Sequence, residues 1–407
     1  MTAPSPARQG PLEPLRVLDL STVLAGPTTA QLLADYGADV VKVEHPQVGD
    51  PFRGHGHQKA GTGLWWRVVS RNKRCVGLKL SVTEGADVLR RLAAGADVVV
   101  ENFRPGTMER WGLGWEDLHH VNPRLVMTRV SGFGQQGPYS TRPGFGTLAE
   151  AMSGFAAITG PADGDPILPS NAMADSIAGI AAATATMMAL WHRDRLGGSG
   201  EGQMIDVSLI EPILATMGPG PTWFDQLGVL QQRMGNRSLD QAPRNTYRTA
   251  DGTWLAVSTA ATPVADRVMR MIGRDDLADA DWFALAAGRG EHGDEIDSAV
   301  AEWIAARTES EVVAAFERAD AAIAPILDAE QLLSDPQVLA LDMIPTVQDP
   351  DLGPLRMTGP MWRMSATPGA IRHPGRVAIG ADTDEVLAEV GYGTPEIDAL
   401  RALGVVA

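Results

Sequence analysis

One carboxylate stands where it could act as a nucleophile. Asp175 follows the tetrapeptide NAMA and opens the alanine-rich run SIAGIAAATATMMAL, which predicts a helix over Asp175–His192. A carboxylate at a helix N-terminus is kept ionised by the positive end of the helix dipole and by free backbone N–H groups. An ionised carboxylate is able to attack an acyl group. The same position also suits an ordinary helix N-cap, and the residues alone favour that second interpretation.

A second group of residues has the chemistry to bind phosphates and an aromatic base. Asn102, Phe103 and Arg104 come at the end of the strand-like run DVVVEN, where open α/β sheets usually bind their ligands. Phe103 could pack on a purine, while Arg104 and Arg110 could meet phosphate groups. The segment RVVSRNKRCVGLK adds cations that could hold phosphates or could equally balance nearby acids in a solvated loop, namely Arg67, Arg71, Lys73, Arg74 and Lys79.

Three other chemistries find little support in the sequence. Gly132–Gly137 (GFGQQG) matches the dinucleotide-binding fingerprint, but Pro138 stands where the helix should begin and no acidic residue follows at the required distance. His55, His57 and the pair His119–His120 lack cysteine or acidic residues at metal-ligand spacing, so no metal site is expected. No G-x-S-x-G elbow is present, which argues against a serine hydrolase.

Composition narrows the class of protein further. The 407 residues include 50 acidic and 34 basic side chains and carry a net charge of −16, so no overall field attracts nucleic acid or anionic lipid. Cys75 is the single cysteine, and the N-terminal MTAPSPARQGPLEP lacks the apolar core of a signal peptide, so we expect a cytoplasmic protein. The apolar run Ile177–Trp191 is too short and too rich in alanine for a membrane span and indicates a buried helix.

Alternating strands and helices must position these residues. Strands are predicted at Arg16–Leu20, Asp39–Glu44, Cys75–Leu80, Asp97–Asn102, Leu125–Val130 and Gln203–Leu209. Helices are predicted at Pro27–Tyr36, Glu84–Ala93, Met108–Trp111, Thr147–Ile158 and Asp175–His192. This alternation favours an α/β fold with a doubly wound, mostly parallel, Rossmann-like sheet.

The composition changes near Gly218, which indicates a second domain. A hairpin is predicted over Asn245–Ser258, with its turn at Asp251-Gly252, and three amphipathic helices follow before Ala319. A strand-like LRMTGPMW and a last helix at Thr383–Val390 come near the end of the chain. We therefore expect a large α/β domain in residues 1–224, a smaller α+β domain in 225–330, and a C-terminal segment, 331–407, that returns to the large domain.

Several segments together resemble the family III CoA-transferases, or CaiB/BaiF family. This group contains formyl-CoA transferase, carnitine CoA-transferase and, as a divergent branch, α-methylacyl-CoA racemase. The likeness covers nearly the whole chain and lies in VLDLSTVLAGPTTAQLLADYGADVVKVEHP, RNKRCVGLKL, DVVVENFRPGTMERWGL, SGFGQQGPY, RPGFGTLAEAMSG, MADSIAGI and GADTDEVLAEVGY. It implies transfer of CoA from an acyl-CoA donor to a free carboxylic acid.

The resemblance implies that Asp175, in MADSIAGI, is the catalytic aspartate. In the family this carboxylate attacks the donor thioester, forms a mixed anhydride and is then converted to an aspartyl-CoA thioester, which the acceptor acid attacks in turn. CoA and acyl-CoA are therefore expected as substrates, with no permanently bound cofactor and no metal. The resemblance also places CoA against Leu24, Ala25, His45, Leu78, Lys79, Leu80, Ser81, Asn102, Phe103, Arg104, Arg110, Arg142 and Phe145.

Two departures from the family pattern bear on the reaction. Phe145 stands where the racemase branch has a proton-transferring histidine, and Gly146 stands where many members carry an acidic residue. Phe145 argues against a racemase, and the intact MADSIAGI argues against a non-catalytic CoA-binding or nucleotide-binding protein, but both remain as alternatives. The glycine-rich loop of formyl-CoA transferase is not recognisable in GNRSLDQAPRNTYRTADG, so formate and oxalate are not assumed as substrates.

The resemblance finally implies a form of assembly. Members of the family form homodimers in which each ring-shaped chain threads the other. A domain interrupted by residues 225–330 and completed by the C-terminal segment would close such a ring. We therefore expect an interlocked homodimer that binds acyl-CoA and a small carboxylic acid, and neither nucleic acid nor membrane.

Overall fold

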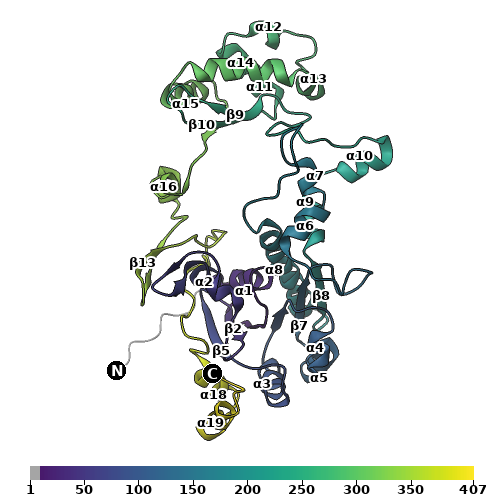
Figure 1. Cartoon of the computed structure of the whole chain (residues 1–407), viewed down its shortest axis with the longest axis vertical. Coiled ribbons are helices and arrows are strands. Elements are labelled where there is room, and N and C mark those ends of the chain that lie inside the picture. Colours follow the sequence, from purple (N-terminus) through teal and green to yellow (C-terminus); the bar gives the residue numbers. More distant parts are fainter. Residues whose placement is uncertain (1–9) are drawn as a thin grey trace. The chain divides into compact units, whose positions relative to one another are not determined.

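The chain forms two compact units in the computed structural model (Figure 1). Unit 1 contains Met1–Phe155, Leu168–Gly220 and Leu339–Ala407, and unit 2 contains Ala156–Ile167 and Pro221–Val338. The structure describes residues 10–407, so most of the leader segment that was judged for a signal peptide lies outside the described residues.

Unit 1 is built on a six-stranded sheet in the order β5-β2-β1-β6-β7-β8, in which every neighbouring pair is parallel. This confirms the α/β, doubly wound, mostly parallel fold. The chain starts near the middle of the sheet, moves outward to β5, and crosses back to place β6 beside β1. The strands are β1 Arg16–Asp19, β2 Asp39–Glu44, β5 Lys73–Gly77, β6 Val98–Glu101, β7 Val126–Ser131 and β8 Met204–Ser208.

Helices cover both faces of this sheet, which explains why its strands are almost continuously apolar. Side chains alternate along β1, so Val17 packs towards α1 (Ala25–Asp35) and α8 (Met173–Asp194). Leu18 joins the opposite cluster with α3 (Thr83–Ala93), α5 (Trp115–Val121), α18 (Thr383–Glu389) and α19 (Thr394–Ala402). Two further helices of this part of the unit are α4 (Thr107–Arg110) and α9 (Ile210–Thr216). Four short elements precede β5, namely η1 (Pro51–Gly54), β3 (Gln58–Lys59), β4 (Thr62–Gly63) and α2 (Leu64–Val69).

Two of the predicted helices differ from expectation. The segment Thr147–Ile158 is divided into α6 (Gly146–Met152) and α7 (Phe155–Ile158), because Gly154 adopts φ +90°, a conformation that favours glycine. The helix α8 has 22 residues, so the apolar run is longer than expected and is, by length and composition, sufficient to cross a membrane. Within unit 1, α8 packs against α1 through small side chains, and a Cβ on Gly179 would lie 2.9 Å from the Ala25 carbonyl.

Unit 2 has an antiparallel sheet in the order β11-β10-β9. The predicted hairpin is present as β9 (Arg244–Arg248) and β10 (Trp254–Ser258), and β11 is Ile323–Pro325. The expectation of three helices after it is wrong, because the segment breaks into five: α11 Thr262–Met271, α12 Asp275–Ala278, α13 Ala286–Glu291, α14 Gly293–Ala305 and α15 Glu309–Arg318. The other helices of this region are α10 Gly220–Leu227, α16 Ala329–Leu332 and α17 Pro336–Ala340.

The C-terminal segment returns to unit 1. A hairpin of β12 (Thr346–Asp349) and β13 (Gly353–Arg356) precedes α18, which packs on β5 (Figure 1). The sequence predicts the last helix at Thr383–Val390. That helix is present as α18, but a further helix, α19, follows it. Val406 then forms an antiparallel bridge with Leu78, directly after β5.

Candidate active site

A cleft of about 500 Å³ opens at the carboxyl ends of β1, β6, β7 and β8 in unit 1. The strand order reverses between β1 and β6, and ligands of open α/β sheets bind at such a reversal. We call this cavity the main cleft. Its lining includes Leu24, Ala25, Asn102, Phe103, Arg104, Arg142, Phe145 and Asp175, which are eight of the residues singled out in the sequence.

A smaller cavity of about 240 Å³, the side pocket, lies at the carboxyl ends of β1, β2, β5 and β6. It is lined by His45 and by Leu78, Lys79, Leu80 and Ser81. Thr22 and Phe103 line both cavities, so the two adjoin one another. The side pocket therefore brings together the remaining expected contacts except one.

That exception is Arg110. It lies on α4, is exposed, and donates from Nη2 to the hydroxyl of Thr107 at 2.9 Å. Arg110 lines neither the main cleft nor the side pocket. Phe103, by contrast, packs edge-on against Trp111 with their ring centroids 5.1 Å apart, which fixes the aromatic face between the two cavities.

Asp175 lies half-buried in the first turn of α8 and opens into the main cleft. It does not cap the helix, because the N-cap is Ala172 and no side chain caps it. Burial raises the pKa of Asp175 to about 6, and the charge of Glu150 adds to the rise. Desolvation and the charge of Glu150 therefore outweigh the helix N-terminus in setting this pKa, although the carboxylate is still mainly ionised at neutral pH.

Gly146 makes room for this carboxylate. A Cβ built at Gly146 would lie 2.2 Å from Oδ2 of Asp175, far inside van der Waals contact. Gly146 is also the first residue of α6, so the absence of a side chain lets the start of α6 approach the start of α8. The position of the Asp175 carboxylate therefore depends on a glycine at residue 146.

Glu150 is a residue of the site that sequence reasoning missed. It is 2% exposed, lines the main cleft from α6, and accepts a hydrogen bond at Oε1 from the backbone N–H of Ala174 at 3.1 Å. The available signal was a single glutamate in the small-residue run LAEAM, where a buried helix face would normally be apolar.

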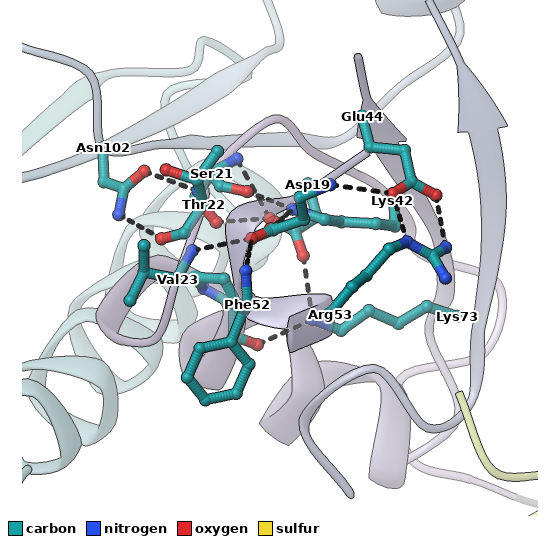
Figure 2. A network of polar contacts seen from close by, with 12 residues as sticks. Asp19, Ser21, Thr22, Val23, Lys42, Glu44, Phe52, Arg53, Lys73 and Asn102 are labelled. Carbon is teal, nitrogen blue, oxygen red and sulfur yellow. Dashed lines mark hydrogen bonds and ion pairs between the residues drawn. The ribbon is translucent and has the colours of Figure 1, made fainter. Parts of the chain in front are cut away.

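The loop between β1 and α1 is held by side chains from two other segments, which follow β6 and β2 (Figure 2). Asn102 accepts from the Thr22 N–H and donates to the Thr22 carbonyl, both at 2.7 Å. Asp50 accepts from the backbone N–H groups of Val23 at 3.2 Å and Phe52 at 2.8 Å. Val23 adopts φ +66°, which is unfavourable for a β-branched residue, so these bonds stabilise a strained loop.

A fully buried network of charges lies beneath this loop, and we call it the lysine network (Figure 2). Lys42 Nζ lies 2.8 Å from Asp50, and Lys73 Nζ lies 2.8 Å from Asp19. Burial alone would raise the pKa of Asp19, but Lys42 and Lys73 hold it below its usual range. Each buried carboxylate of the network thus has a cation beside it.

The basic segment before and within β5 is neither a phosphate site nor a solvated loop. Its cations are used in ion pairs inside unit 1: Arg67 with Asp349 at 2.5 Å, Arg71 with Asp35 at 2.6 Å, Lys73 with Asp19 at 2.8 Å and Arg74 with Asp39 at 2.6 Å. Lys79 lines the side pocket, whereas the other four line neither the side pocket nor the main cleft. Both interpretations of the cluster therefore fail for its other members.

No group of three or more histidine, cysteine, aspartate or glutamate side chains in residues 10–407 has the arrangement of a metal site. Fold and cavities define an α/β protein with a cleft at the reversal of strand order in a doubly wound sheet, lined by a carboxylate whose pKa is raised.

Comparison with known proteins identifies the class. Residues 12–383 match the family model described as CoA-transferase family III. A succinyl-CoA--D-citramalate CoA-transferase of Chloroflexus aurantiacus is 40% identical over 100% of both chains. The beta subunit of a succinyl-CoA--L-malate CoA-transferase of the same organism is 38% identical over 97% of this chain and 98% of its own. The chain therefore belongs to CoA-transferase family III and is an acyl-CoA:carboxylate CoA-transferase, with CoA thioesters and carboxylic acids as substrates.

A solved structure agrees with this assignment. The crystal structure of a CAIB/BAIF family protein from Brucella suis superposes with a TM-score of 0.80 at 28% identity, covering 94% of this chain and 100% of that one. The resemblance noted in the sequence is confirmed.

Proposed function

We propose that Asp175 is the nucleophile of this CoA-transferase. Its carboxylate oxygen attacks the carbonyl carbon of the donor thioester, the C–S bond breaks, and the electron pair leaves with CoA as a thiolate. The thiolate then attacks the aspartyl carbonyl of the mixed anhydride, releasing the donor acid and leaving an aspartyl-CoA thioester. The acceptor carboxylate attacks this thioester, and the returning thiolate cleaves the second anhydride to give the new acyl-CoA.

The observation that carries this proposal is the position of Asp175 in the main cleft. The carboxylate forms no ion pair within the described residues, and it lies beside Gly146, where no side chain blocks approach. Since its pKa is about 6, the nucleophile is mainly ionised at neutral pH yet more basic than an ordinary aspartate. Each step exchanges one activated acyl group for another, so we propose that no permanently bound cofactor takes part.

We further propose that the two adjoining cavities divide the CoA molecule between them. The side pocket, with His45 and Leu78 to Ser81, would take the nucleotide end, and the main cleft would take the thioester end. Phe103 borders both cavities and offers an aromatic surface, while the exposed side chains of Arg104 and Arg142 are available to phosphate. Because Arg110 lines neither cavity, we assign it only an outer contact with CoA.

The names of the relatives point to a class of substrate. They describe CoA transfer from succinyl-CoA to citramalate or malate, and succinate, citramalate and malate are all short dicarboxylates. We propose succinyl-CoA as the donor and a hydroxy-substituted dicarboxylic acid of similar size as the acceptor. His55 in the main cleft offers a hydrogen-bond donor for the carboxylate that does not react, since Arg104 and Arg142 are assigned to phosphate. We place this chemistry in the cytoplasm.

The decisive experiment incubates the protein with a panel of acyl-CoAs and free acids and detects new CoA thioesters by mass spectrometry. Succinyl-CoA alone should load the protein with a hydroxylamine-sensitive adduct. Asp175→Ala should bind CoA and keep the fold but form neither adduct nor product. Turnover near the unmodified level in Asp175→Ala would refute the mechanism.

We also propose that the protein works as an interlocked homodimer. Unit 1 is completed only after the chain has passed through unit 2 and returned at Leu339, which is compatible with a closed ring. Separation of interlocked rings requires at least partial unfolding, so loss of the dimer and loss of structure should coincide. Light scattering and circular dichroism over a dilution series test this, and a folded monomer at low concentration would exclude interlocking.

A further inference from the structure

The main cleft contains a second buried carboxylate for which the reaction described above has no use. Glu150 is 2% exposed and lies on α6, one helical turn after Gly146. Its one side-chain hydrogen bond within the described part of the chain is accepted at Oε1 from the Ala174 N–H, at 3.1 Å. Among residues 10–407 it forms no ion pair, although a buried carboxylate normally requires a cation.

This hydrogen bond fixes Glu150 next to the nucleophile. Ala174 directly precedes Asp175, and both belong to the first turn of α8. An N–H in the first turn has no partner within the helix, so Glu150 supplies the acceptor that Ala172, the N-cap, lacks. The same bond keeps a negative charge close to the Asp175 carboxylate.

No other charge offsets this pair. The elements packed against α8 are α1, α6, α9, β7 and β8. Their other charged side chains are engaged elsewhere: Asp35 with Arg71, Glu211 with Ser208, Arg129 with Glu101 and Glu109, and Asp206 with the Gln135 N–H. The titratable or cationic side chains His55, Arg104 and Arg142 line the main cleft but form no ion pair with either carboxylate in the described part of the chain.

We propose that Glu150 is a positioning residue that activates Asp175 by a repulsion which acylation relieves, an inference that rests on the proposed role of Asp175 as nucleophile. In the free enzyme two negative carboxylates lie close together in a partly desolvated place. When Asp175 forms its bond to the acyl carbon, its charge leaves with the CoA thiolate, and the side chain becomes a neutral anhydride. Glu150 therefore destabilises the free carboxylate relative to both covalent intermediates.

A second consequence concerns orientation. The bond to the Ala174 N–H ties α6 to the start of α8, so Glu150 also sets the direction in which the first turn presents Asp175. Glutamine at this position would keep an acceptor for that N–H and would remove only the charge. The two contributions of Glu150 are thus separable by substitution.

The test uses Glu150→Gln in the full-length protein. We expect the acid limb of the kcat/KM profile to move to lower pH by roughly one unit, and the equilibrium fraction of acylated protein to fall roughly tenfold. Glu150→Asp keeps the charge, so the acid limb of its kcat/KM profile should lie close to that of the wild-type protein. Glu211→Gln is the matched control, because Glu211 also accepts a hydrogen bond at a helix start but lies outside the main cleft.

The outcomes separate this inference from the proposed function. If wild-type protein forms no hydroxylamine-sensitive adduct, the proposed nucleophile itself fails. If wild-type and Glu150→Gln proteins form equal amounts of adduct with the same acid limb, only the activation by Glu150 is refuted. Equal shifts in Glu150→Gln and Glu150→Asp would also refute it, because they would show an effect of packing and not of charge.

Discussion

Unit 1 buries charge in two contrasting ways. In the lysine network every carboxylate has a cation beside it, with Lys42 on Asp50 and Lys73 on Asp19, each at 2.8 Å. At the junction of α6 and α8, Asp175 and Glu150 lie in the same cleft and form no ion pair within the described residues. Both clusters lie within unit 1, the first among β1, β2 and β5 and the second where α6 meets α8.

The contrast separates a cluster that stabilises the fold from one that suits the proposed reactivity of Asp175. A matched network lowers the energy of ionised side chains and fixes the loop that carries Leu24 and Ala25. An unmatched pair raises the energy of the ionised side chains, and burial together with the charge of Glu150 raises the pKa of Asp175 to about 6. Strongly perturbed carboxylates without cations are characteristic of functional sites, whereas buried ion pairs are common structural features.

The largest effect is expected from breaking the matched network. Lys42→Met leaves Asp50 and Asp19 without one of their cations in a fully buried site. Removing one partner of a buried pair costs about 3–5 kcal/mol, so the free energy of unfolding should fall by this amount in urea titrations. Asp87→Asn, at the exposed pair with Arg90, is the control and should change it by less than about 1 kcal/mol.

A second prediction concerns the space beside the unmatched pair. Gly146→Ala places a Cβ 2.2 Å from Oδ2 of Asp175 and forces the carboxylate to move. Since a misplacement of about 1 Å costs roughly 100-fold in rate, kcat should fall by about that factor while the melting temperature changes little. Gly95→Ala is the control, because a Cβ at Gly95 meets no atom within 4 Å. Full activity in Gly146→Ala would contradict the close approach.

A third prediction concerns Asp175, whose replacement should raise the free energy of unfolding, whereas replacement of Lys42 should lower it. The pKa of Asp175 is about 6 in the fold against 3.8 in an unperturbed aspartate, so the folded state holds the proton through this interval while the unfolded state loses it. The free energy of unfolding should therefore fall as pH rises from 4 to 6. Asp175→Asn removes this loss and should stabilise the protein by about 1–3 kcal/mol at pH 7, with little gain at pH 4.

Urea titrations at the two pH values provide the measurement for Asp175→Asn. The exposed Asp87→Asn should show no comparable gain on going from pH 4 to pH 7. Destabilisation of Asp175→Asn at pH 7 would mean that the carboxylate has a favourable partner, and the contrast between the two clusters would then be lost.

The smallest effect is expected for proton transfer. Two carboxylates could also act as bases, but racemisation needs a second group that exchanges a proton, and Phe145, which is 68% exposed at the cleft, has none. Deuterium from heavy water should therefore enter 2-methylacyl-CoA no faster than without protein. Rapid incorporation that disappears in Asp175→Ala would support the racemase alternative.

The sheet and its binding edge could be predicted from local sequence. Short apolar runs such as DVVKVE and DVVVEN place their strands almost to the residue, and the alternation with helices predicts parallel pairing. The order of the six strands has no local signal, because it depends on which crossover covers which face. Residues at strand ends nevertheless converge, since all these ends share one edge of the sheet.

The contacts inside the site could be predicted less well from the sequence. The partner of Arg67 is Asp349, 282 positions away, so nothing near Arg67 distinguishes a buried ion pair from a phosphate site. Glu150 was missed because a helical pattern does not reveal which residue faces a neighbouring helix start. The signal for helix α19 lies in its Thr394-Pro395 start and in Glu396, which accepts a hydrogen bond from the Gly393 N–H at 2.7 Å.

The return of the chain to unit 1 has a consequence for biosynthesis. Asn72 donates to the carbonyl of Ala370, 298 positions later. At roughly 5–20 residues per second, the ribosome needs about 15–60 s to make this stretch. All residues of unit 2 leave the ribosome within that interval, whereas Arg67, Arg71 and Asn72 still await their acceptors. The unit encoded in the middle of the chain is thus the first to be able to fold, and the unit that begins the chain is the last to close.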